Sequence, residues 1–191
     1  MSYDPPRPPG RLLLTPEDRE APARVRRLRE LGLEQRPDPA LDVFAGHLAG
    51  LAGAPYAMVN FLDEGGQFFA GLRVPVPPLP APGERPQPEL GRTLPRDHGY
   101  CPHVVARRRA LALEDVRDYP RFAGNPVVDE YGIHSYLGAP LIDTTGTVLG
   151  TVCVADQSPR SWGTQGLRTI KATAAELAVR LERRAEDGLP L

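Results

Sequence analysis

Residues 133–157, IHSYLGAPLIDTTGTVLGTVCVADQ, decide the fold of this chain. They form two apolar runs, rich in β-branched residues, on either side of DTTG at residues 143–146, and this pattern predicts an antiparallel hairpin. A second hairpin is predicted in YAMVNFLDEGGQFFAGLRV, residues 56–74, because DEGG supplies residues that tolerate the positive φ of a tight turn. ALALEDV, residues 110–116, predicts a further short strand.

Two helices are predicted before these strands. In PARVRRLREL, residues 22–31, apolar residues recur at spacings of three with arginines between them, which favours an amphipathic helix (Val25, Leu28 and Leu31). The next helix begins at Asp38, whose carboxylate can cap free amides, and Pro39, which is well tolerated in a first turn. Its apolar positions are Leu41, Phe44, Leu48 and Leu51, and Gly53 ends it.

The last predicted helix carries a narrow apolar stripe at heptad spacing, formed by Leu167, Ile170, Ala174, Leu177 and Leu181. Such a seam is typical of a helix that packs on another helix rather than on a sheet. The partner helix is either the first helix of the same chain or a second copy across a two-fold axis. We therefore expect a homodimer through Leu167, Ile170, Leu177 and Leu181.

Antiparallel hairpins flanked by terminal helices predict an α+β layer fold, with the terminal helices on one face of the sheet and connecting segments on the other. Residues 1–22, rich in proline and arginine, are predicted to be a disordered tail, and residues 187–191 a second tail. Residues 23–186 then form a single domain. The proline-rich stretch at 74–96 is predicted to be an extended surface insert, because proline donates no hydrogen bond to a sheet or helix.

Composition excludes several partner classes. A formal net charge of −1 gives no electrostatic reason to bind nucleic acid or an anionic membrane. No apolar run approaches the ~20 residues that a membrane span needs, and the start of the sequence has no hydrophobic signal core, so we expect a cytoplasmic protein. The two cysteines, Cys101 and Cys153, are too few for a disulfide framework and are expected to be free thiols.

Several stretches, taken in order, resemble a bacterial GAF domain of the kind found in sensor kinases, diguanylate cyclases and free-standing actinobacterial proteins. They are PDPALDVFAGHLAGLAGAPYAMVNFLDEGGQFFAG, GYCPHVV, DVRDYPRFAGNPVV, YLGAPLIDTTGTVLGTVCVAD and PRSWGTQGLRTIKATAAELAVRLE, and together they cover roughly residues 24–184. The resemblance implies a sheet of about five to six antiparallel strands. It also implies terminal helices on one face, often paired with those of a second subunit, and a pocket under loops and short helices on the other.

The segment DHGYCPHVV, residues 97–105, places a cysteine, a proline and a histidine together. If Pro102 is the first helical residue, Cys101 is the cap, and the positive helix end lowers its pKa. The alternative is that Cys101 is a small, partly buried side chain that packs the helix on the sheet. His103 lies two residues further on, so the two side chains diverge on a helix and share no metal ion, and no metal site is predicted.

The resemblance also implies candidate site residues: Tyr100, Cys101, His103, Asp115, Tyr131 and Tyr136 are expected to line or border the pocket. Each has another reading, since tyrosine commonly packs in cores, His103 can hydrogen-bond a loop, and Asp115 can cap the turn that follows it. Free methionine sulfoxide reductases use the GAF scaffold with a nucleophilic cysteine and a resolving partner. Here Cys153 is expected to lie along a strand, far from easy access, and to provide no resolving thiol for Cys101.

The sequence therefore predicts a non-catalytic sensory domain that binds a small molecule and signals through dimer helices or a partner protein. The alternatives are a redox enzyme of the free methionine sulfoxide reductase type using Cys101, and a ligandless scaffold whose proline-rich insert binds a partner. No cofactor can be named from the sequence.

Overall fold

The computed structural model describes residues 15–33, 35–76, 88–188 and 191. The elements in chain order are α1 (Ala21–Glu30), α2 (Pro39–Ala52), β1 (Tyr56–Leu62), β2 (Gly66–Arg73), β3 (Thr93–Pro95), α3 (Cys101–Arg107), β4 (Leu111–Leu113), the 3-10 helix η2 (Val116–Asp118), α4 (Pro120–Ala123), α5 (Pro126–Tyr131), β5 (Ser135–Ile142), β6 (Val148–Asp156) and α6 (Gly163–Asp187). This succession confirms the predicted α+β class. Across the described residues, no helix combines the length and the apolar character that crossing a membrane requires.

The strands form one six-stranded antiparallel sheet in the order β3-β2-β1-β6-β5-β4. Both predicted hairpins are present, as β1–β2 and β5–β6, and β1 pairs with β6 at the centre of the sheet. The close pairing of the hairpins depends on Gly150, because a Cβ there would overlap the carbonyl oxygen of Asn60. The strand number agrees with the five to six that were expected.

The edge strand β3 corrects one prediction. It lies inside the stretch 74–96, which was predicted to be a surface insert. Residues 77–87 of that stretch lie outside the described part of the chain, but its end pairs with β2 and buries Leu90 and Leu94 in the interior. Proline is tolerated in an edge strand because the outer side of that strand has no ladder to complete.

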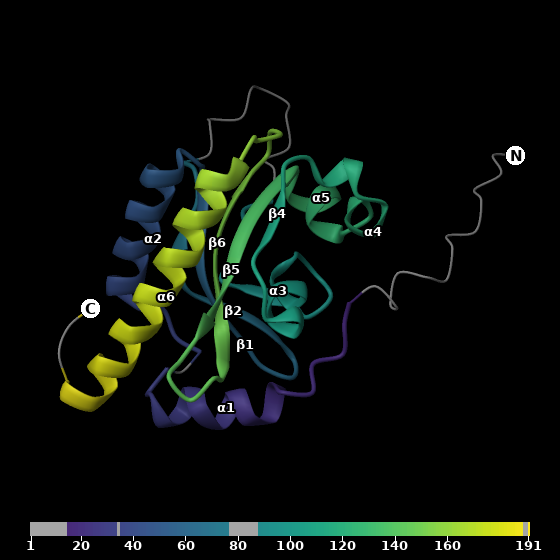
Figure 1. Ribbon diagram of the computed structural model, residues 1–191. Helices are drawn as coiled ribbons and strands as arrows, with labels where there is room; N and C mark the ends of the chain where they lie inside the picture. Colours follow the sequence, from purple (N-terminus) through teal and green to yellow (C-terminus); the bar gives the residue numbers. More distant parts are fainter. Residues whose placement is uncertain (1–14, 34, 77–87, 189–190) are drawn as a thin grey trace, which may run out of the picture.

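Helices α2 and α6 cover one face of the sheet side by side, as Figure 1 shows at its left. The apolar seam of α6 packs on this face, chiefly on β5, rather than on another helix: Ile170, Leu177 and Leu181 are at most 1% exposed, and Leu167 is partly buried. The prediction that these residues face a helix partner is therefore wrong. Because α2 shares the face, α6 needs only a narrow apolar stripe. On α2, Leu41 and Leu48 are buried, whereas Leu51 is 69% exposed.

Helix α1 lies across one end of the sheet (Figure 1). Its Arg24 is fully buried, donates from Nε to the carbonyl oxygen of Leu62 at 2.9 Å and from Nη1 to that of Val148 at 3.3 Å, and pairs with Asp18. Arg24 thus satisfies carbonyl groups where β1 ends and β6 begins. Since Asp18 takes part in this contact, the ordered chain begins before the predicted tail boundary at residue 22; residues 1–14 lie outside the described part.

The opposite face of the sheet is covered by α3, α4 and α5 (Figure 1), and Val116 of η2 and Leu90 pack in the same layer. Beneath them lies a second hydrophobic core, separate from the core under α2 and α6. The strands supply both cores because alternate side chains point to opposite faces, so that on β5 Tyr136 belongs to the second core and Leu137 to the first. The two-sided arrangement is the one that the sequence predicts.

Candidate functional site

A pocket lies in the second core, under the segment 88–100, α3 and α5, with a free volume of about 40 Å³. Its walls are apolar and aromatic, and they include Met58 of β1, Phe69 of β2 and Ala155 of β6. Among the described residues that line it, every side chain other than the ionisable thiol of Cys101 is uncharged. A void of this size holds a molecule of a few atoms, because ~10–15 Å³ of such space already admits one water.

Four of the six predicted site residues line this pocket: Tyr100, Cys101, Tyr131 and Tyr136. Tyr100 is the N-cap residue of α3 and contacts Tyr136, with ring centroids 5.2 Å apart. Its hydroxyl is buried and has no hydrogen-bond partner among the described residues. Burial raises the pKa of Tyr100, so the hydroxyl keeps its proton and can donate it to a ligand.

The two cysteines contact each other beside this pocket. Sγ of Cys101, at the start of α3, lies 3.6 Å from Sγ of Cys153 on β6, and both thiols are free and buried. Cys153 is buried, as expected, but it lies against Cys101 rather than apart from it, because strand alternation turns its side chain toward α3. Cys101 is also the first residue of α3 and not its cap, which is Tyr100.

Tyr136 also contacts this pair of cysteines, since its hydroxyl lies 3.3 Å from Sγ of Cys101. To reach it, the ring lies across Gly138 of the same strand, where a Cβ would overlap the Tyr136 hydroxyl and stand 2.6 Å from Cζ. The hydrogen bond from Cys153, together with the nearby polar side chains of Thr151, Tyr136 and Asn60, lowers the pKa of Cys101. Cys153 is held in the thiol form, because its hydrogen bond to Cys101 and its burial raise its pKa.

A row of polar side chains that was not predicted from the sequence crosses the sheet below α3. Asn60 Nδ2 donates to Gln67 Oε1 at 2.9 Å, and Gln67 Nε2 donates to the carbonyl oxygens of Pro95 and His98. Thr151, directly opposite Asn60 in the β1–β6 ladder, has a buried hydroxyl with no partner among the described residues. A single asparagine inside the apolar run YAMVNFL was the available signal, since a buried polar residue requires a partner.

His103 and Asp115 do not line the pocket. His103 is buried on α3 with its ring edge-to-face against Phe122, at a centroid distance of 5.0 Å. Burial, with Arg121 and Arg107 nearby, lowers the pKa of His103 to about 4, so the ring is neutral at pH 7. Asp115 caps η2 by accepting from the Arg117 amide at 3.0 Å and pairs with the Arg117 guanidinium, which is the alternative role that the sequence allowed.

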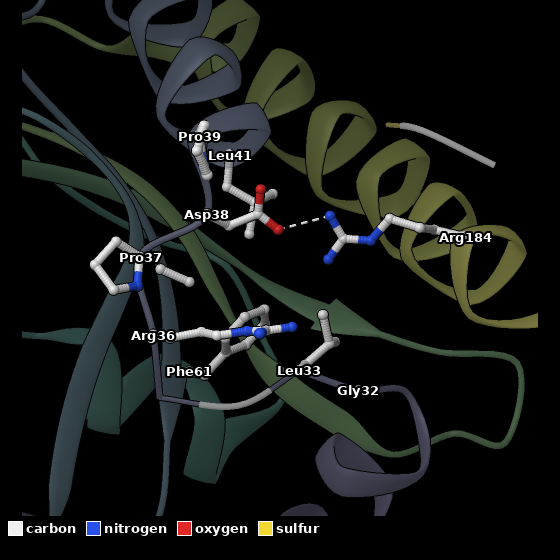
Figure 2. Close-up of a pocket in the computed structure, with 10 residues that line it drawn as sticks. Gly32, Leu33, Arg36, Pro37, Asp38, Pro39, Leu41, Phe61 and Arg184 are labelled. Atoms are coloured by element: carbon white, nitrogen blue, oxygen red, sulfur yellow. Dashed lines mark hydrogen bonds and ion pairs between the residues drawn. The ribbon is translucent and has the colours of Figure 1, made fainter. Parts of the chain in front are cut away.

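A wider cavity of about 290 Å³ lies on the helical side of the molecule, where α2 begins and α6 approaches its end. Figure 2 shows Asp38 and Arg184 pointing toward each other across it, with Arg184 Nη1 2.6 Å from Asp38 Oδ2. Asp38 also accepts from the Ala40 amide at 2.9 Å, which caps α2 as predicted. The ion pair therefore joins the two helices that cover the sheet. In the part of the chain that the structure describes, no three His, Cys, Asp or Glu side chains gather as a metal site would need.

Comparisons with known proteins agree with this geometry. The family model of the GAF domain matches residues 36–181. A cyclic di-GMP phosphodiesterase of Pseudomonas aeruginosa is 28% identical over 134 residues, which are 69% of this chain and 20% of that protein. The chain thus spans about a fifth of the length of this relative.

Two solved structures illustrate the range of proteins that share the fold. The GAF domain of an Acinetobacter phosphoenolpyruvate-protein phosphotransferase superposes with a TM-score of 0.56 at 18% identity, covering 90% of this chain and 99% of that domain. Free methionine-R-sulfoxide reductase from Neisseria meningitidis, solved in complex with its substrate, gives a TM-score of 0.53 at 18% identity, covering 90% and 93%. At these identities the likeness concerns the fold alone.

Proposed function

The chain belongs to the GAF domain family, and from that premise we propose that it is a non-catalytic sensory domain that binds a small, neutral molecule in the pocket beneath α3. The observation that carries the proposal is an apolar pocket without acidic or basic side chains, lined in part by Tyr100, whose buried hydroxyl has no partner among the described residues. A buried hydroxyl without a partner costs free energy, and a ligand that accepts its hydrogen bond removes this cost.

The character of the pocket wall limits the class of ligand. A phosphate or a zwitterionic amino acid buried against uncharged side chains would lose its hydration without gaining an ionic partner. This argues against a cyclic dinucleotide or free methionine sulfoxide at this site, although related proteins act on such molecules. The void of about 40 Å³ favours a ligand of few atoms in the conformation that the structure presents.

A route for the signal follows from β5, which contributes to both faces of the sheet. Tyr136 lines the pocket, and its neighbour Leu137 packs in the core beneath α6. A ligand that displaces Tyr136 would therefore shift the strand on which α6 rests, and helix shifts of this kind carry signals between subunits.

We extend the proposal to a homodimer, with different contact residues from those the sequence suggested. The seam of α6 is used within the chain, but Leu51 of α2 and Val179 of α6 are exposed by 69% and 42%. These apolar side chains, with Val43 at 59%, could pack against a second copy across a two-fold axis. Light scattering that finds only monomers at high concentration would refute the dimer. The ligand-binding proposal would stand.

Native mass spectrometry of the protein purified from its own host tests ligand binding. We expect a defined additional mass that is lost on denaturation. Ala155→Leu should abolish this mass because the larger side chain fills the void that Ala155 lines. Ala172→Leu, on the exposed side of α6, is the matched control and should retain it.

The alternative outcomes of this experiment identify the competing functions. A protein that carries no additional mass in any preparation favours the ligandless scaffold. An additional mass that survives in Ala155→Leu places the ligand elsewhere and contradicts the proposal. Release of methionine from added free methionine sulfoxide by the reduced protein would establish the reductase alternative instead.

A further inference from the structure

The two cysteines of the chain are 52 positions apart in sequence, yet their sulfur atoms lie 3.6 Å apart in the second core. A disulfide bond has an S–S length of about 2.05 Å, so rotation of the two side chains has only a short gap to close. Neither thiol has a second cysteine as a competing partner, because the chain contains only these two.

The two sulfur atoms differ in their access to small molecules. Cys101 lines the pocket and is 4% exposed, whereas Cys153 does not line it and is 0% exposed. The uncharged wall and small volume of the pocket suit a neutral molecule such as hydrogen peroxide better than an anion or a bulky oxidant. Cys101 is thus the sulfur that an entering oxidant meets first.

The groups around Cys101 favour the form that reacts with peroxides. The thiolate is the nucleophile, and the neighbouring hydroxyl of Tyr136 can donate a hydrogen bond to it. The buried hydroxyl of Thr151, which has no partner among the described residues, lies on the same face of β6 as Cys153 and can reorient toward the sulfur.

From this geometry we propose that Cys101 and Cys153 form a redox site, at which a hydroperoxide oxidises the two thiols to an intramolecular disulfide. Cys101 releases its proton and attacks the peroxide, so that an S–O bond forms and the O–O bond breaks. The departing oxygen, hydroxide from hydrogen peroxide or alkoxide from an organic hydroperoxide, takes a proton and leaves as water or as an alcohol. Cys153 then loses its proton and attacks the sulfenic sulfur, so that the S–S bond forms, the S–O bond breaks, and the released hydroxide takes a proton and leaves as water.

The product joins α3 covalently to β6. Cys101 then offers neither an S–H donor nor a thiolate acceptor to the Tyr136 hydroxyl, whose ring is confined over Gly138, so the hydrogen bond between the two side chains weakens. Since Tyr136 also lines the pocket, oxidation changes the wall at which a ligand would bind. The redox site does not depend on the proposed ligand, because it requires only the thiol pair and entry of a hydroperoxide.

The test uses the full chain, reduced and freed of reductant, and then exposed to hydrogen peroxide. Samples are denatured at intervals and treated with a maleimide mass tag that counts free thiols. We expect both thiols to disappear together, the chain to lose the mass of two hydrogen atoms, and dithiothreitol to restore both thiols.

Three results with the wild-type chain would overturn the proposal. They are the loss of one thiol while the other remains, the formation of disulfides between chains, and the survival of both thiols under peroxide that oxidises glutathione in a separate tube. This measurement needs no variant, so a misfolded mutant cannot obscure it. Its failure would leave the ligand measurement of the preceding section untouched, since that experiment detects an additional mass and not a thiol.

Single-cysteine variants test the order of events. In Cys153→Ser, the sulfenic acid cannot be resolved, and dimedone should label Cys101. In Cys101→Ser, the remaining thiol does not line the pocket, and we expect at least a tenfold slower loss of Cys153. Equal rates of thiol loss in the two variants would contradict the assignment of Cys101 as the attacking sulfur.

Discussion

His103 gives the most direct test of how tightly α3 is packed. Burial beside Phe122, with Arg107 on α3 and Arg121 on α4 nearby, lowers the pKa of His103 from 6.5 to about 4. The folded protein therefore resists protonation, and between pH 6.5 and 4 the unfolded chain binds the additional proton. The contribution of His103 to the free energy of unfolding is therefore present in full above pH 6.5. It declines as the pH falls from 6.5 to about 4, and below about pH 4 His103 causes no further loss.

The size of the effect follows from the shift. One pKa unit corresponds to 1.36 kcal/mol, so a shift of this size makes His103 responsible for a loss of about 3 kcal/mol between pH 7 and pH 4. His103→Phe and His103→Gln both remove the titrating ring, one with an apolar and one with a polar replacement. Urea unfolding of the three proteins across this pH range should show that both variants lose about 3 kcal/mol less than the wild type.

The two replacements control for each other. A packing effect would separate His103→Phe from His103→Gln by a constant amount at every pH, whereas the titration effect changes with pH and is common to both. If the wild type and both variants lose the same free energy of unfolding between pH 7 and pH 4, the argument that burial keeps His103 neutral is refuted.

Three further predictions concern packing and assembly. Gly138→Ala should destabilise the protein by about 1–3 kcal/mol in urea unfolding and slow the oxidation of the thiols, because the new methyl group displaces the Tyr136 hydroxyl; unchanged stability would contradict the close approach. Arg24→Met should lower the free energy of unfolding by about 3–5 kcal/mol, because it leaves buried carbonyl groups unpaired. Arg26→Met, at an exposed position of α1, is the matched control and should lower it by less than about 0.5 kcal/mol. Equal losses of unfolding free energy in the two variants would show that the buried hydrogen bonds of Arg24 do not stabilise the fold. Leu51→Gln should weaken self-association in light scattering at unchanged stability, and an unaltered mass would exclude α2 from the dimer contact.

Local signals were sufficient for the elements that the sequence places correctly. The pair Asp38–Pro39 predicts the start of α2 because capping and the tolerance for proline act within one turn. The two hairpins are likewise encoded by adjacent residues. The sequence could not decide which face of a strand meets which helix, and for this reason the partnership of Cys153 with Cys101 was missed.

The C-terminal helix α6 shows that apolar spacing alone does not identify the packing partner of a helix. Its apolar spacing was interpreted as a contact with another helix, yet the stripe packs on β5. A narrow stripe results whenever two helices share one face of a sheet, and the spacing alone does not distinguish this case from a helical partner. Within the candidate site, Leu90 and Leu94 were missed for a related reason, since a proline-rich composition does not reveal that the end of the segment turns back into the core.

The position of Arg24 has a practical consequence for anyone preparing a shorter recombinant fragment. The residues that match the family begin at 36 and end at 181, so a fragment cut to these limits lacks both Arg24 and Arg184. The carbonyl oxygens of Leu62 and Val148, at the end of the sheet that α1 covers, would then lose their donor Arg24. Asp38 would lose its ion pair with Arg184. Such a fragment should aggregate at concentrations where the protein that retains residues 15–188 remains in solution.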